Sequence, residues 1–60
     1  MQTTIRKAIE IITPRVEDGI PIFINYKEVE NPIEILDQYL DLDKEVYLYD
    51  DYSEVQILIK

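Results

Sequence analysis

The sequence predicts a small two-layer α+β domain, in which three strands form a mixed sheet and two helices cover one face of it. Three observations indicate this fold: an isoleucine stripe with helical spacing near the N-terminus, a strong helix start at Asn31-Pro32, and two alternating segments near the C-terminus. Sixty residues allow one domain, so residues 1–60 should form a single unit. The predicted order of elements is α-β-α-β-β.

Residues 3–13 carry the first predicted helix. Four apolar residues recur there at i, i+3, i+4 and i+7: Ile5, Ala8, Ile9 and Ile12. Pro14 marks the expected end, because the residue before a proline disfavours the helical conformation. A strand is the alternative, since isoleucines also alternate in this segment and favour strands. The order would then be ββαββ, with a hairpin at Asp18-Gly19.

The remaining elements follow from local signals. Residues 20–26, IPIFINY, alternate as a strand does. Residues 31–41 form the second helix, because Asn31, Pro32 and Glu34 suit its N-cap and first turn. This helix is expected to connect two parallel strands in a right-handed crossover. Residues 44–50 and 54–60 alternate again, and the short link between them predicts an antiparallel hairpin.

Strand alternation predicts that the sheet has one uncovered face. The residues expected to face the helices are Ile22, Ile24, Val46, Leu48, Val55, Ile57 and Ile59, which leaves Phe23, Tyr47, Tyr49, Gln56 and Leu58 on the other side. Exposed aromatic patches often mark interaction surfaces, although tyrosine is also an ordinary strand residue. We predict an interface at Phe23, Tyr47, Tyr49 and Leu58. A second copy of the chain, in a twofold homodimer, is its expected occupant.

The net charge of −7 is concentrated in the second half of the chain. Residues 1–30 hold four bases and five acids, whereas residues 31–60 hold two bases and eight acids. Direct nucleic-acid binding is not expected, because it requires a basic patch. The predicted partner-binding acids are Asp43, Glu45, Asp50, Asp51 and Glu54. They would meet a basic protein surface, or imitate the phosphates of a nucleic acid, unless the charge only maintains solubility.

Catalytic and metal-binding chemistry finds little support. The chain has no cysteine and no histidine, which removes disulfides and the usual zinc, copper and haem ligands. With one serine and one glycine, it has neither an activated nucleophile nor a phosphate loop. Asp41-x-Asp43-x-Glu45 is similar to the start of a calcium loop, but Val46 and Tyr52 stand where the required glycine and glutamate would be. We therefore predict that the chain is not an enzyme and has no cofactor and no dedicated metal site. A metal-dependent module is kept as a third hypothesis, behind the two binding functions described below.

The sequence also predicts a cytoplasmic protein. It contains no apolar run approaching the roughly 20 residues of a membrane span, and no signal-peptide pattern. We therefore expect no membrane partner.

The order of apolar and acidic positions resembles that of short, acidic, uncharacterised proteins from phages and mobile elements of Firmicutes. The resemblance covers IEIIT, GIPIFINY and YLDLDKEVYLYDDYSEVQILI, and it includes no diagnostic motif and no site residue. Such small phage proteins include inhibitors of bacterial defence systems, which commonly act by binding and are often dimers. The resemblance thus implies a phage-encoded inhibitor that occludes a basic surface of a host defence enzyme in the host cytoplasm. The alternative is an accessory subunit, structural or regulatory, that acts through the aromatic sheet face.

Overall fold

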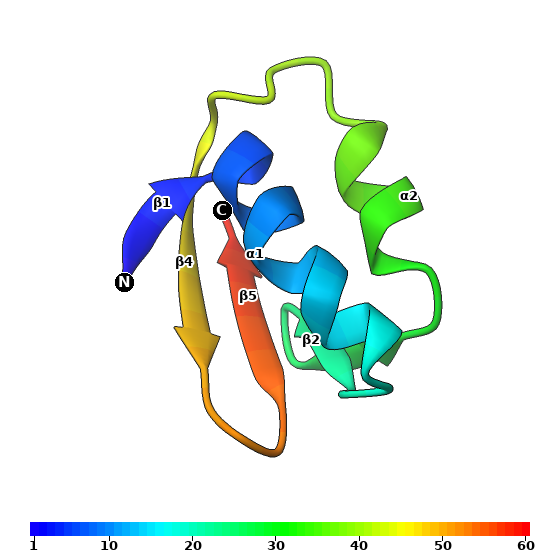
Figure 1. Ribbon diagram of the computed structural model, residues 1–60. Coiled ribbons are helices and arrows are strands. Elements are labelled where there is room, and N and C mark those ends of the chain that lie inside the picture. The colour runs from blue at the N-terminus through cyan, green and yellow to red at the C-terminus, as the bar shows by residue number, and fades with distance from the viewer.

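The computed structural model describes all 60 residues and contains two helices and a five-stranded mixed sheet (Figure 1). The elements are β1 (Gln2–Thr4), α1 (Ile5–Glu17), β2 (Ile22–Ile24), β3 (Lys27–Val29), α2 (Pro32–Asp37), β4 (Glu45–Asp50) and β5 (Val55–Ile59). Their order along the chain is β-α-β-β-α-β-β. The predicted three-stranded sheet with the order α-β-α-β-β is therefore wrong, and so is the alternative ββαββ.

The strands lie in the order β1-β4-β5-β2-β3, with β5 at the centre. β5 pairs antiparallel with β4 and parallel with β2, so β2 and β4 run in opposite directions. The predicted parallel crossover between these two segments is wrong, because the hairpin of β2 and β3 reverses the chain before α2 begins. Both helices lie on the same side of the sheet (Figure 1).

The unpredicted β3 exists because the chain turns at Asn25 and Tyr26. Both residues have positive φ, 49° and 71°, as the two central residues of a type I′ hairpin turn do. Asn25 also ties the turn to the sheet, since its side-chain oxygen accepts a hydrogen bond from the Ile59 amide at 2.8 Å. Glycine usually occupies the second position of such a turn, and its absence conceals this hairpin in the sequence.

The helix α1 begins directly after the short edge strand β1. Thr4 pairs with Glu45 in the sheet, and its hydroxyl oxygen also caps the helix by accepting the Lys7 amide at 3.2 Å. Two further amides at the start of the helix donate to the loop before β4, from Ile5 to the Lys44 carbonyl and from Arg6 to that of Leu42. These bonds satisfy donors that a helix start leaves free.

The prediction that α1 ends before Pro14 is wrong. The exposed proline removes one backbone donor, yet the helix continues to Glu17 and closes with a Schellman motif at Gly19, whose φ is 76°. In this motif Gly19 donates to the Val16 carbonyl and Ile20 donates to the Arg15 carbonyl, both at 3.0 Å. The extra turn places Arg15 on the helix.

The helix α2 is shorter than predicted. It begins at Pro32 as expected, but the Asn31 side chain makes no capping hydrogen bond. Because the helix ends at Asp37, Leu40 falls outside the expected apolar stripe and is fully exposed.

One apolar core lies between the helices and the sheet. Its buried residues are Ile5, Ala8, Ile12, Ile22, Leu36, Val46, Leu48, Val55, Ile57 and Ile59. Six of the seven strand residues predicted to face the helices belong to it, and the seventh, Ile24, is half-buried. Only 11 of the 60 residues are buried, so the core is small and the expected stability is modest.

Candidate interaction face

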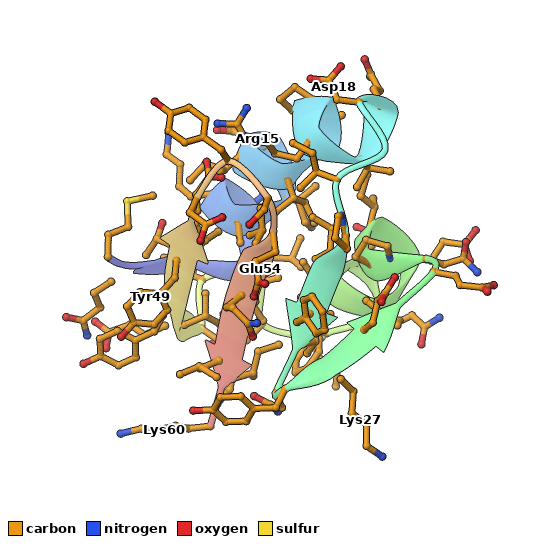
Figure 2. The ribbon with its side chains drawn as sticks, turned by 90° about the horizontal axis from the view of Figure 1, so that it is seen from below. Arg15, Asp18, Lys27, Tyr49, Glu54 and Lys60 are labelled. Carbon is orange, nitrogen blue, oxygen red and sulfur yellow. The ribbon has the colours of Figure 1, made fainter.

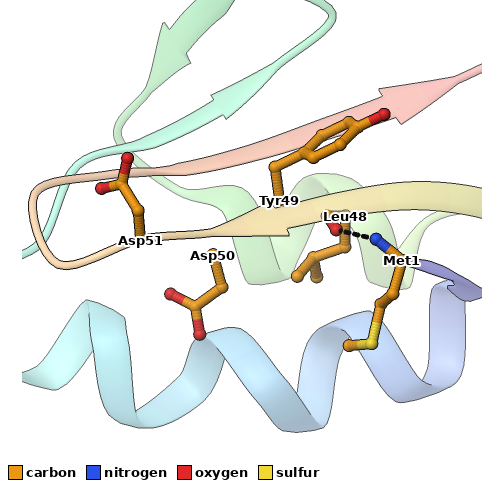
Figure 3. Close-up of a pocket in the computed structure, with 5 residues that line it drawn as sticks. All are labelled: Met1, Leu48, Tyr49, Asp50 and Asp51. Atoms are coloured by element: carbon orange, nitrogen blue, oxygen red, sulfur yellow. Dashed lines mark hydrogen bonds between the residues drawn. The ribbon is translucent and has the colours of Figure 1, made fainter.

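The sheet face opposite the helices carries the predicted aromatic patch. We call this surface the open face and define it by Phe23, Tyr47, Tyr49, Gln56 and Leu58. Tyr47 lies opposite Leu58, while Gln56 lies between Tyr49 and Phe23. Figure 3 shows Tyr49 projecting away from α1, whereas Leu48 and Asp50 project toward it.

The open face stays accessible to solvent. Tyr47 is 38% exposed and Tyr49 is 55% exposed, and the other three residues are half-buried by their neighbours in the sheet. Covering apolar surface contributes about 25 cal/mol per Å² to binding before the costs of association are subtracted. A partner with a complementary shape would therefore gain from this face.

Gln56 is the polar centre of the open face. Its side-chain amide group donates to the carboxylate of Glu54, but its side-chain carbonyl oxygen is buried without a hydrogen-bond partner. An unpaired buried acceptor is unfavourable, and most buried polar atoms in proteins have a partner. The alternating pattern of the sequence placed Gln56 on this face but gave no sign of this unpaired oxygen.

Carboxylates border the open face. Glu28 lies opposite Phe23, Glu45 lies two residues before Tyr47 in β4, and Glu54 lies directly before β5, two residues from Gln56. Glu45 accepts a hydrogen bond from the Gln2 side chain at 2.8 Å. Lys60, at the other end of β5 from Glu54, is the one base that strand alternation assigns to this side (Figure 2).

The five predicted acidic residues do not form one cluster. Asp43 and Glu45 lie at the start of β4, whereas Asp50, Asp51 and Glu54 lie at its far end and in the hairpin. At about 3.3 Å per residue, the six residues of β4 separate its two ends by roughly 17 Å. Nowhere do three or more residues of metal-binding type gather in a way that could hold an ion.

Two of these acids are engaged by arginines of α1. Asp50 accepts three hydrogen bonds from Arg15, of which the closest joins Nη2 to Oδ2 at 2.9 Å. This bonding, together with the negative charge of Asp50, raises the pKa of Arg15. Asp43 meets Arg6 at 3.3 Å in a more exposed pair. The charge count of the sequence could not reveal these long-range pairs.

Asp51 organises the hairpin between β4 and β5. Its Oδ1 accepts hydrogen bonds from the amide and the hydroxyl of Ser53, at 2.8 and 3.0 Å, and from the amide of Glu54 at 3.1 Å. These bonds lower the pKa of Asp51, with the Ser53 amide as the largest cause. The single serine of the chain is therefore a turn residue that donates to a carboxylate.

Two surface hollows meet near this hairpin. One of about 540 Å³ is lined by Met1, Leu48, Tyr49, Asp50 and Asp51 and lies beside the outer edge of β4 (Figure 3). The other, of about 370 Å³, is lined by Arg15, Ile20, Asp50, Asp51 and Tyr52. They share Asp50, which is bound by Arg15, and Asp51, which is bound within the turn. Neither hollow therefore presents an unengaged pair of carboxylates.

Comparison with known proteins gives no match: no family model, no curated protein and no solved structure is similar to this chain. The structure itself contains no helix with the length and apolar character that crossing a membrane requires.

Proposed function

We propose that this chain is a non-catalytic protein-binding module that uses its open face to cover a basic surface of a partner protein. The observation that carries the proposal is the placement of Phe23, Tyr47, Tyr49 and Leu58 on a sheet face with no covering element. Tyrosine and phenylalanine are enriched in protein interfaces, where large rings contribute area. A typical stable interface takes about 800 Å² from each partner, about a fifth of the 4232 Å² that this chain exposes.

The charges around the open face favour a basic partner. Glu28, Glu45 and Glu54 border the patch, and the chain as a whole carries −7. Complementary charge raises the rate of association and excludes partners of like charge. Of the five acids predicted to bind a partner, Asp50 and Asp51 already have hydrogen-bond partners within the chain. The proposal therefore does not rely on these two residues.

A homodimer through the same face remains a second prediction, with an opposite dependence on salt. Two copies bring −7 against −7, so salt screening should strengthen self-association. Binding to a basic partner should instead weaken as salt rises. Light scattering at low and high salt separates the two, and a monomer under both conditions contradicts the dimer. Inhibition of a host defence enzyme also remains a prediction, which rests on the sequence resemblance alone.

Site-specific photocrosslinking tests the proposed function. A photoreactive phenylalanine analogue replaces Tyr49 on the open face or, as a control, the fully exposed Tyr52 of the hairpin. We expect position 49 to crosslink a discrete protein from a bacterial lysate, less so at high salt or after Tyr47→Ala, and position 52 not to do so. Equal crosslinking from both positions, or none from position 49, would contradict the proposal.

A further inference from the structure

A second surface, separate from the open face, lies where the end of α1, the edge strand β3 and the start of α2 meet. A hollow of about 250 Å³ extends from Val16 to β3, and another of about 300 Å³ extends from Val16 along residues 30–34. The two hollows share Val16, Glu30 and Pro32 and therefore lie next to each other. We call this surface the β3 groove.

The β3 groove has an apolar floor and an acidic border. Val16, Ile20, Val29 and Ile33 line it and are half-buried, so part of each side chain remains accessible. Three of the residues that line it are acidic, namely Glu28, Glu30 and Glu34, and none of them takes part in an ion pair. Glu28 lies opposite Phe23, so its side chain extends from the β3 edge toward the side of the open face.

No base lines the β3 groove beside these acidic residues. The residues that line the two hollows include no lysine and no arginine. Lys27, at the other end of β3, projects away from the end of the molecule where Asp18 lies (Figure 2). Its position leaves the acidic border of the groove free to attract cations from outside.

The free edge of β3 adds a backbone component. β3 is the last strand of the sheet, and Glu28 lies opposite Phe23. In β2 and the turn after it, the odd-numbered residues direct their backbone N–H and C=O groups toward β5. Asn25 shows this, because its amide donates to the Ile57 carbonyl at 2.8 Å. By the alternation of an antiparallel pair, Glu28 directs its amide and carbonyl groups to the outer edge. An extended segment can bond to such an edge.

We propose that the β3 groove binds an extended protein segment in which lysine or arginine alternates with apolar residues. Alternate side chains of an extended segment point to opposite sides, so one set can reach the apolar floor while the other reaches the carboxylates. The electrostatic fit selects cations, and the edge of β3 selects an extended backbone. This inference does not rest on the function proposed for the open face, because Glu28 is the only residue that the two surfaces have in common.

The test uses the full ¹⁵N-labelled chain and a capped six-residue peptide that alternates lysine with leucine. We expect amide shifts to change at the non-proline residues within 16–22 and 28–34 and not at Tyr47 or Tyr49. Two control peptides, with glutamate in place of lysine or serine in place of leucine, should bind much more weakly. Glu30→Gln and Glu34→Gln should each weaken binding about two- to five-fold, the range for an exposed ion pair.

Asp37→Asn is the matched control, because it removes one carboxylate at the other end of α2 without touching the groove. Its affinity for the peptide should equal that of the unaltered chain. Equal weakening by Asp37→Asn and Glu34→Gln would show attraction by overall charge only and overturn the groove. Shifts confined to the open face would also overturn it, while supporting the function proposed for that face. The absence of any shift would likewise overturn the proposal and indicate that the charged side chains of β3 protect its edge from pairing.

Discussion

Arg15 in the last turn of α1 forms a bidentate ion pair with Asp50 at the end of β4. Two nitrogens of the Arg15 guanidinium group donate to both carboxylate oxygens of Asp50. The pair joins elements that are 35 residues apart in sequence. It is the best-formed ion pair of the molecule, with the Arg15 side chain 41% and the Asp50 side chain 23% exposed. A two-pronged arginine–carboxylate pair fixes geometry better than a single contact does.

We expect Asp50→Asn to lower the Tm measurably, because it weakens all three hydrogen bonds to Arg15 at once. Asp43→Asn is the control, since the Arg6–Asp43 pair has one contact of 3.3 Å between more exposed side chains and should contribute almost nothing. Thermal unfolding followed by circular dichroism measures both variants. Equal Tm values for Asp50→Asn and the unaltered chain would show that the pair does not stabilise the fold.

Acid should weaken the hairpin through Asp51. Because folding lowers the pKa of this carboxyl from its ordinary value of 3.8, its contribution is fully present above pH 3.8 and is lost as pH falls toward the folded-state pKa. Asp51→Asn keeps the accepting oxygen but removes the titration. We expect the variant to lose less stability than the unaltered chain between pH 5 and pH 2.5 in urea titrations. The same loss in both would mean that other carboxyls cause the acid sensitivity.

Tyr26→Gly should stabilise the chain by about 0.5–1 kcal/mol, because glycine adopts positive φ without the strain that a side chain incurs there. Tyr26 is 77% exposed, so the substitution removes little packing. Asn25→Ala is the opposite control, since it removes the hydrogen bond to the Ile59 amide and should destabilise. Urea unfolding measures both. Destabilisation by Tyr26→Gly would show that the ring makes a stabilising contact.

Gln56→Met should leave the fold as stable or stabilise it by up to about 1 kcal/mol, because it replaces a buried, unpaired carbonyl oxygen with an apolar group of similar length. The loss of the hydrogen bond to Glu54 partly offsets this gain. Gln2→Met serves as a comparison, since the amide of Gln2 is exposed and bound to Glu45. A large loss of stability in Gln56→Met, measured by urea unfolding, would contradict this account of the orphaned oxygen.

The sequence predicted the elements whose signals are local and repeated. The isoleucine spacing located α1, and the alternation in residues 44–50 and 54–60 identified the core side of β4 and β5 as well as the tyrosines on the open face. These patterns are reliable because a period of 3.6 or 2 determines which side of an element each residue occupies. The role of the open face remains a proposal.

The missed features depend on long-range or atypical contacts. β1 is three polar residues that become a strand only by pairing with β4, more than 40 positions away. β3 depends on a turn whose second residue is tyrosine in place of the usual glycine. The predicted helix ended before Pro14. In the structure α1 continues for about one more turn and ends in the Schellman motif at Gly19. Because of that error, the sequence analysis did not identify Arg15 as the partner of Asp50. It therefore assigned Asp50 to partner binding, although this residue is bound within the chain.

The central position of β5 has a consequence for how the chain reaches its native state. Residues 55–59 are translated after the other four strands. They nevertheless form the strand that joins the β1–β4 half of the sheet to the β2–β3 half. Until they are available, the two halves share no backbone pairing, and the parallel contact with β2 requires closure of a loop of about thirty residues. Such non-local pairing slows folding. We therefore expect the nascent chain to stay unfolded on the ribosome until β5 has left the exit tunnel, and fragments that stop before Val55 to be substrates for proteolysis.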